Sequence, residues 1–365
     1  MAIHTDADRH ALHVKKADEA HCIGPDSVTG YLNAHRIVNL AVATGCDALH
    51  PGYGFLSENP LLAEICAARR IRYIGPDATV IRSMGDKIAA RTMMQDAGVP
   101  VVPGSDTSLR SQEEALALAA QIGYPVMLKA TTGGGGRGIR RCESEDVLRR
   151  QYDRVLSEAG KAFGRAEIYM EKCIDRPRHI EVQVIADQHG NAVHLGERDC
   201  STQRRHQKVI EEAPAPGITP EQRNEIGSIC VEACKRIGYR GAGMITFVHD
   251  HTDFAVTAVD CIAPPDHATS EERSGASFIG WRLRVHRGEA LPEHEPAADG
   301  VAMEVRLLAE DPDNGFAITP GRVALLSFPV GTGVRVDADA ICRIAREHDL
   351  LSVFDGVCVG EQLLG

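Results

Sequence analysis

The sequence lacks the features typical of membrane proteins and of disulfide-bonded secreted proteins. Its 365 residues contain no apolar run near the ~18 residues that a bilayer-spanning helix needs, and its first residues contain no apolar signal core. The 11 cysteines are scattered singly, without a CxxC pair, which argues against a disulfide framework and against a zinc site. We therefore expect buried thiols in a reducing compartment and a cytoplasmic protein.

Long runs of like charge are absent as well. The formal net charge is −11, which on electrostatic grounds argues against a nucleic-acid partner. The hydrophobic content of 43% and the charged content of 25% are ordinary for a soluble globular protein. We find no internal repeat and no low-complexity segment. The length is enough for about two or three compact domains.

Short apolar runs alternate with helical patterns at the start of the chain. Residues 38–51 and 71–77 indicate helix-to-strand units of a parallel α/β sheet. Further strands are expected at 124–130, 166–174, 178–199 and 244–260. A linker-like stretch at 289–300 precedes a final β-rich portion.

A glycine loop follows one of these strands. In KATTGGGGRGIR (129–140), consecutive glycines allow backbone N–H groups to close over phosphate oxygens. The loop is not a Walker A loop, because no Gly-Lys-Ser/Thr follows it. By itself it is also compatible with a flexible turn. Lys129, placed on the preceding strand, favours phosphate binding.

Three other segments are informative together and weak alone. Lys87 at a helix start would usually be a solvated surface residue, and YMEKCI (169–174) would usually be a hydrophobic edge strand. The segment ERDCSTQRRHQKVIEEAPAP (197–216) is dense in hydrogen-bonding groups. Its arginines need charged partners, which makes a plain solvated loop the weaker interpretation.

The order and spacing of these segments resemble biotin carboxylase, the ATP-grasp subunit of acetyl-CoA and other acyl-CoA carboxylases. The matching phrases are HPGYGFLSEN, IGP, MGDK, KATTGGGGRGI, YMEK, PRHIEVQV, ERDCSTQRRHQKVIEEAPAPGITPE and IGYRGAG. The resemblance is nearly continuous to about Phe254 and resumes in WRLRVHRGEALP, EVRLLAEDP and GVRVD. It implies a multidomain α/β and α+β fold. The implied domains are a Rossmann-like domain at 1–84, an ATP-grasp domain at 85–290 with its lid near 125–175, and a β-rich domain at 291–365.

The resemblance also implies roles for individual residues. The ATP-binding set is Lys87, Lys129, Gly133, Gly134, Gly135, Gly136, Glu171, Lys172, Ile174, His179, Gln203 and His206. The catalytic set is Lys208 for bicarbonate, Arg306 for the biotin enolate and Asp266 as the base. The implied cofactors are ATP, Mg²⁺ or Mn²⁺, and carrier-bound biotin. The implied partners are a biotin carboxyl carrier protein, other carboxylase subunits and a second copy of the chain.

The chain departs from the family pattern at the metal-binding strand pair. Thr246 and Ala258 stand where the family has its magnesium-binding glutamates, and Asp260 is the acid that remains. Ile262 replaces the bicarbonate-binding arginine, and Asp266 replaces the glutamate base. The family's first strand and its last stretch are also missing, so we expect an incomplete first sheet and a truncated C-terminal domain.

Three hypotheses follow. The first is a catalytically impaired homologue that acts as a non-catalytic or regulatory carboxylase subunit, because the losses cluster on one strand pair while the scaffold motifs survive. The alternative is an active biotin carboxylase that uses ATP and bicarbonate. The third is a nucleotide-binding module without carboxylase partners. Of these, the sequence alone favours the first.

Overall fold

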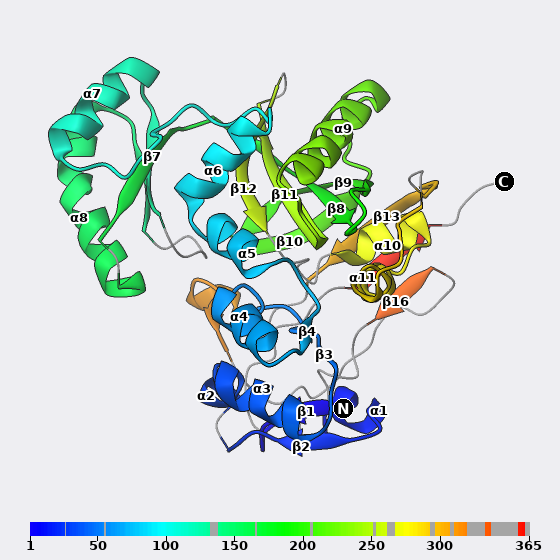
Figure 1. Ribbon diagram of the computed structural model, residues 1–365. Helices are drawn as coiled ribbons and strands as arrows, with labels where there is room; N and C mark the ends of the chain where they lie inside the picture. Colours follow the sequence, from blue (N-terminus) through cyan, green and yellow to red (C-terminus); the bar gives the residue numbers. More distant parts are fainter. Residues whose placement is uncertain are drawn as a thin grey trace.

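The chain forms a mixed α/β structure, described here from a computed structural model (Figure 1). The structure describes residues 1–25, 27–54, 56–131, 138–164, 166–204, 207–250, 253–260, 267–292, 296–306, 310–319, 333–336 and 357–361. Within these ranges, no helix combines the length and the apolar character that crossing a membrane requires.

The N-terminal part contains two small pairs of parallel strands. β1 (Ala2–His4) pairs with β2 (Ala20–Cys22), and β3 (Ala48–Leu49) pairs with β4 (Arg72–Tyr73). Its helices are α1 (Leu12–Lys16), α2 (Ser27–Tyr31), α3 (Ala34–Ala43), α4 (Pro60–Ala68) and α5 (Ala78–Gly85). The expected helix-to-strand units are present. Their strands are only two or three residues long and form separate pairs instead of one sheet.

A small lobe carries the strand that precedes the glycine loop. β5 (Val126–Ala130) lies between β6 (Ile139–Cys142) and β7 (Ile168–Lys172), with antiparallel pairing on both sides. α7 (Gln112–Ile122) and α8 (Glu145–Phe163) cover one face of this sheet, at the upper left of Figure 1. Because side chains alternate along a strand, Val126 and Leu128 pack against these helices while Lys129 points to the opposite face.

Among the residues that the structure describes, the large sheet has eight strands in the order β12-β11-β8-β9-β10-β13-β17-β16. Their bounds are β8 (Arg178–Ala186), β9 (Ala192–Arg204), β10 (Gln207–Ala213), β11 (Gly241–His249), β12 (Phe254–Asp260), β13 (Val301–Val305), β16 (Val334–Val336) and β17 (Val357–Glu361). β13 pairs with β10 from Ile210 to Ala213. The linker-like stretch at 289–300 therefore leads back into the same sheet and not to a separate one.

Helices cover both faces of the large sheet. α6 (Lys87–Asp96) and α9 (Pro220–Arg236) bury Met94 and Cys230 against Val182 on one face. α11 (Phe278–Arg287) buries Phe278 against Ile185 on the other face, near α10 (Ala268–Ser274). A capping box of Thr219 and Gln222 begins α9. The remaining elements are β14 (Glu310–Asp311), η2 (Pro312–Asn314) and β15 (Ala317–Ile318).

The alternation along β8 decides where the polar residues of this strand lie. Ile180, Val182 and Val184 belong to the core under α6 and α9, whereas Ile185 belongs to the core under α11. Glu181 and Gln183 have the same parity as Ile185, so both are placed on the face toward α10 and α11. β8 thus places its buried polar side chains Glu181 and Gln183 on the face toward α10 and α11.

Candidate active site

On the small lobe, Lys129 and Glu171 form a buried ion pair. They lie on the adjacent strands β5 and β7, on the face away from the helices. The Lys129 ammonium donates to the Glu171 carboxylate, and their side chains are 16% and 5% exposed. Lys129 Nζ also lies 3.4 Å from Thr257 Oγ1 on β12. The lysine expected to hold phosphates therefore stands between the lobe and the large sheet.

Lys87 lies beside the end of the same strand. It is the first residue of α6, which Asp86 caps by accepting hydrogen bonds from the backbone N–H groups of Ile88 and Ala89. The Lys87 backbone N–H donates to the Thr131 carbonyl over 3.2 Å. The structure thus brings Lys87 and Lys129 to the start of the glycine loop. Gly133, Gly134, Gly135 and Gly136 themselves lie outside the described residues.

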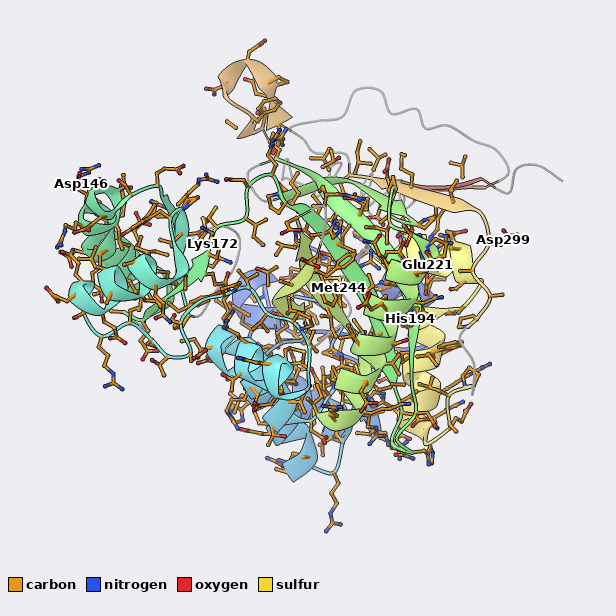
Figure 2. All side chains as sticks on the ribbon, turned by 90° about the horizontal axis from the view of Figure 1, so that it is seen from above. Asp146, Lys172, His194, Glu221, Met244 and Asp299 are labelled. Carbon is orange, nitrogen blue, oxygen red and sulfur yellow. The ribbon has the colours of Figure 1, made fainter. Side chains whose placement is uncertain are left out.

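Lys172 and Glu171 are neighbours in sequence but point in different directions. Lys172 Nζ donates to the carbonyls of Gly123 and Tyr124, each over 3.0 Å. The side chain thus fixes the turn before β5 and does not join the Lys129 pair. Figure 2 shows Lys172 in the small lobe, well separated from Met244 and His194 of the large sheet. Ile174 is half-buried just beyond β7.

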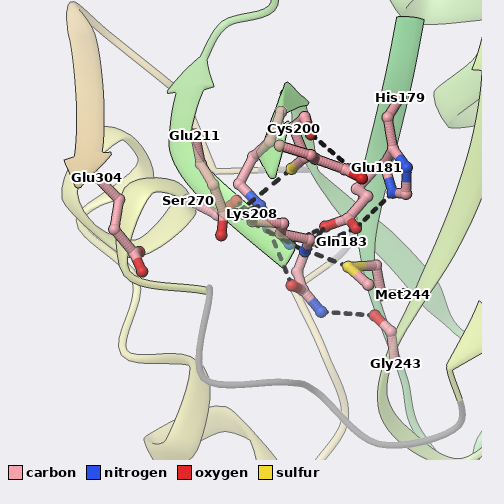
Figure 3. Close-up of polar contacts among 12 residues, drawn as sticks. His179, Glu181, Gln183, Cys200, Lys208, Glu211, Gly243, Met244, Ser270 and Glu304 are labelled. Carbon is pink, nitrogen blue, oxygen red and sulfur yellow. Dashed lines mark hydrogen bonds and ion pairs between the residues drawn. The ribbon is translucent and has the colours of Figure 1, made fainter. Parts of the chain in front are cut away.

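On the large sheet, Lys208 is held by Glu181. Lys208 on β10 places Nζ 2.7 Å from both carboxylate oxygens of Glu181 on β8 (Figure 3). His179 Nε2 lies 2.9 Å from Glu181 Oε1. Burial opposes the ionisation of Glu181, but the charges of Lys208 and Arg198 and the His179 hydrogen bond outweigh it and hold the Glu181 pKa well below its ordinary value.

Arg306 is held in the same way by Glu211. Arg306 follows β13, and its backbone N–H donates to the Val209 carbonyl over 2.9 Å. Its Nη2 donates to Glu211 Oε1 on β10 over 2.7 Å. Glu211 is the cross-strand partner of Glu304, and the two are 0% and 2% exposed. Arg306 Nε lies 3.9 Å from Glu304, so one guanidinium offsets both acids.

Arg198 joins the two halves of this network. It lies on β9 as the cross-strand partner of Glu181 and is 0% exposed. Its Nη2 donates to Glu181 Oε2 over 3.1 Å, and its Nε lies 3.5 Å from Glu211 Oε2. The sequence singles out Arg198 only as a polar residue in need of partners and misses Glu181 and Glu211. The signal for Glu181 is an acid inside the buried apolar strand RHIEVQVIA.

The remaining predicted residues lie around this network or outside the described residues. Gln203 is the cross-strand partner of Lys208, and its Nε2 donates to the Cys200 carbonyl over 2.8 Å. His179 stands at the edge of the network, with a side chain that is 30% exposed. His206 and Asp266 are not among the described residues. Neither is Ile262.

The two positions expected to carry metal-binding acids lie opposite each other. Thr246 on β11 pairs with Ala258 on β12, and on its other side Thr246 pairs with Glu181. Asp260 is the cross-strand partner of Met244. Thr246 is 2% exposed and offers only a neutral hydroxyl, and Glu181 is already paired with cations. Among the described side chains, this set does not fit magnesium, which prefers carboxylates and water.

Glu181, Cys200 and Glu211 also approach one another closely. Their ligand atoms all lie within 4.8 Å, a spacing that a metal ion could use. However, Lys208 and Arg198 contact Glu181, and Arg306 contacts Glu211. Burial, together with the charge of Glu181, raises the pKa of the Cys200 thiol well above its ordinary value, so the neutral thiol is favoured. The cluster is an ion-pair network and not a metal centre.

The chain is similar to known proteins over most of its length. Residues 1–81 match the family described as biotin carboxylase, N-terminal domain, and residues 86–294 match carbamoyl-phosphate synthase L chain, ATP binding domain. A biotin carboxylase of Nostoc sp. is 47% identical over 342 residues, which cover 93% of this chain and 76% of that protein. The chain belongs to the biotin carboxylase family. The resemblance inferred from the sequence motifs is confirmed.

Other relatives of the biotin carboxylase family are similar over the same span. The 2-oxoglutarate carboxylase small subunit of Hydrogenobacter thermophilus is 46% identical over 92% of this chain and 72% of that protein. The solved biotin carboxylase domain dimer of that carboxylase, with MgADP, ADP and bicarbonate, has a TM-score of 0.92 at 43% identity and covers 98% of this chain and 80% of that chain. The Campylobacter jejuni biotin carboxylase in complex with β,γ-ATP has a TM-score of 0.92 at 42% identity, covering 99% and 81%.

Proposed function

We propose that this chain is a biotin carboxylase component that uses ATP and bicarbonate to carboxylate biotin on a carrier protein. The observation that carries the proposal is the pair of cations Lys208 and Arg306, anchored on the buried acids Glu181 and Glu211. Cations held in advance by buried acids can stabilise negative charge that develops on a bound oxyanion without having to reorganise. Relatives that are 44–47% identical and named biotin carboxylase support this reading over an impaired homologue.

In this proposal one set of residues binds ATP and another set binds bicarbonate and biotin. Lys87 and Lys129 bind the ATP phosphates under the lid formed by residues 133–136, and Glu171, Lys172, Ile174, His179, Gln203 and His206 complete the nucleotide site. ATP phosphorylates bicarbonate, and the carboxyphosphate releases CO2 and phosphate. Biotin N1 passes its proton to the released phosphate, and the resulting enolate attacks the CO2. Lys208 binds the bicarbonate oxygens, Arg306 stabilises the biotin enolate, and Asp266 is the base.

The proposal extends to the organisation of the chain. We place the domain boundaries after residues 84 and 290, with the lid at about 125–175. A homodimer and a carrier-protein partner are part of the proposal, and the solved relative described as a dimer supports the first. Magnesium or manganese would normally accompany ATP. The described donors do not fit it, so no step of the proposal is assigned to a metal.

The test is ADP release by the purified chain, measured with and without bicarbonate, biotin and a biotinylated carrier protein. We expect release that depends on bicarbonate and carboxybiotin that is detected by mass spectrometry. Lys208→Met should lower kcat/KM by about 10²–10³-fold, the range found when one oxyanion partner is removed. Absence of turnover with either Mg²⁺ or Mn²⁺ would exclude the proposal.

One observation favours a second candidate, a non-catalytic carboxylase subunit. Thr246 and Ala258 leave the strand pair without carboxylates where the family places its metal ligands. Calorimetric titration of ATP with and without Mg²⁺ separates the two candidates. Binding that Mg²⁺ strengthens supports the enzyme. Binding indifferent to Mg²⁺, together with co-purifying carboxylase subunits, supports the second candidate.

A further inference from the structure

Arg198 is a charged residue with no direct access to any substrate. Its side chain is 0% exposed, at the middle of the large sheet. A buried guanidinium is costly unless acids and hydrogen-bond acceptors surround it. Here the acids are Glu181 and Glu211, the same two that anchor the cations of the proposed bicarbonate and biotin site.

Each of the two acids contacts Arg198 and one further cation, Lys208 in the case of Glu181 and Arg306 in the case of Glu211. These two are called the outward cations. Glu181 Oε2 accepts from Arg198 Nη2 over 3.1 Å and from Lys208 Nζ over 2.7 Å. Glu211 Oε2 lies 3.5 Å from Arg198 Nε. The other carboxylate oxygen, Oε1, accepts from Arg306 Nη2 over 2.7 Å. A displacement of Arg198 therefore changes the surroundings of Lys208 and Arg306 together.

Neutral groups fix Arg198 independently of the acids. Its Nη1 donates to Gln183 Oε1 and to Ser270 Oγ of α10, each over 3.0 Å. Gln183 Nε2 in turn donates to the Gly243 carbonyl of β11 over 2.6 Å (Figure 3). Because β8, β11 and α10 all hold the guanidinium, it can hold the acids in place, and this is what a positioning role requires.

We propose that Arg198 is a positioning residue for the carboxylation site. It sets where Lys208 Nζ and the Arg306 guanidinium lie, so that both cations can attract an anion while they stay bonded to Glu181 and Glu211. If Arg198 lost its charge, Glu181 and Glu211 would attract Lys208 and Arg306 more strongly and draw them toward the buried network. The site would then become less positive. The inference deepens the proposed function and rests on it for the identity of the anion, bicarbonate.

The kinetic test compares Arg198→Lys and Arg198→Met with a matched control. The control, Arg223→Met, removes an arginine of α9. Arg223 Nε donates to the two carboxylate oxygens of Glu197, a buried acid of β9, over 2.7 and 2.8 Å. We expect Arg198→Met to raise the bicarbonate KM at least about tenfold, with ATP affinity within about twofold. Arg198→Lys, which keeps the positive charge, should raise the bicarbonate KM less than Arg198→Met does. Arg223→Met should leave the bicarbonate KM unchanged. An unchanged bicarbonate KM in Arg198→Met overturns the inference.

A second readout does not depend on turnover. Lysines are reductively methylated with ¹³C, and the Lys208 signal is assigned by its loss in Lys208→Arg. Removal of the Arg198 charge should raise the Lys208 pKa measured by NMR, because Glu181 loses a competing cation. If wild type shows no carboxylation but this shift occurs, the proposed function fails while the positioning role stands. No shift overturns the inference. If Arg198→Met does not fold, the bicarbonate KM of Ser270→Ala is measured in its place. This variant removes one hydrogen bond of Arg198 and keeps its charge, and an unchanged bicarbonate KM overturns the inference.

Discussion

Thr246 and Ala258 are cross-strand partners on β11 and β12, at the edge of a row that continues through Glu181 on β8 to Arg198 on β9. The row runs from uncharged side chains to a buried ion pair. Glu181 and Arg198 offset each other's charge, whereas the row has no charged side chain on the two outer strands, β11 and β12. An acid restored at the outer positions would have no cation of its own in the row.

The first prediction concerns restoring both acids with Thr246→Glu and Ala258→Glu. In the absence of divalent metal, the double variant should be less stable than wild type by roughly 1–3 kcal/mol, because charge is added at a buried position. Mg²⁺ at about 100 times its Kd should return about 2.7 kcal/mol. Thermal unfolding with and without Mg²⁺ measures this effect. The matched glutamine double variant should not respond to Mg²⁺, and a response from it would show that the metal binds elsewhere.

The second prediction concerns the close approach of Gly104 to β7. A Cβ at this position would lie 2.4 Å from the Met170 carbonyl oxygen, which is backbone and cannot move away easily. Gly104→Ala should cost about 1–3 kcal/mol and weaken ATP binding, because the strand that carries Glu171 must shift. Urea unfolding and calorimetric titration measure the two effects.

The control for Gly104 is Gly85, the last residue of α5. A Cβ there meets nothing within 4 Å. Gly85→Ala should therefore be neutral or stabilising by up to about 1 kcal/mol and should not change ATP binding. Equal stabilities for the two variants would contradict the close contact at Gly104.

The third prediction concerns stability in acid. Burial opposes the ionisation of Asp199, but its hydrogen bonds with Ser201 and Arg178 prevail and lower its pKa from 3.8. Its contribution is therefore full above pH 3.8 and is lost as the pH falls through the folded-state pKa. Asp199→Asn should cost about 1–3 kcal/mol at pH 7, with the difference from wild type shrinking below pH 3.8. Urea unfolding between pH 7 and about 3 tests this, and a difference that is constant with pH would refute it.

The fourth prediction concerns His286 of α11, which is 2% exposed. Its Nε2 accepts from the Gly75 N–H over 2.9 Å, and its Nδ1 lies 2.8 Å from the Arg282 carbonyl. Burial lowers its pKa from 6.5 despite the bonding to Gly75 and Arg282, so the neutral form is favoured and stability falls as the pH drops below 6.5. His286→Leu should cost about 1–3 kcal/mol at pH 7.5 and flatten this dependence. A slope equal to that of wild type would exclude His286 as its source.

Local sequence patterns were sufficient to predict the family and the position of several helices and strands. Lys129 was correctly expected on a strand before the glycine loop, and Lys87 at a helix start, because both positions follow from short-range periodicity and capping. The role of Lys172 in nucleotide binding stays a prediction, and the direction of its side chain could not be foreseen. Neighbouring residues on a strand point to opposite faces, and the Lys172 ammonium is taken up by the turn carbonyls.

The buried network could not be read from local patterns. Glu181, Arg198 and Glu211 meet only through the register of β8, β9 and β10, and register depends on the whole sheet. Local patterns also could not show that β13, in the β-rich portion expected after residue 290, pairs with β10 and so continues the large sheet. The glycine lid and the segment containing Asp266 remain predictions.

The contacts of Lys129 bear on which ligands the proposed nucleotide site would select. Its ammonium is already bonded to Glu171 and Thr257, so a ligand gains from this lysine only by offering oxygens that compete with a carboxylate. Triphosphates meet that condition, whereas adenosine does not. Discrimination at this position therefore depends on the charge of the ligand's tail and not on its base.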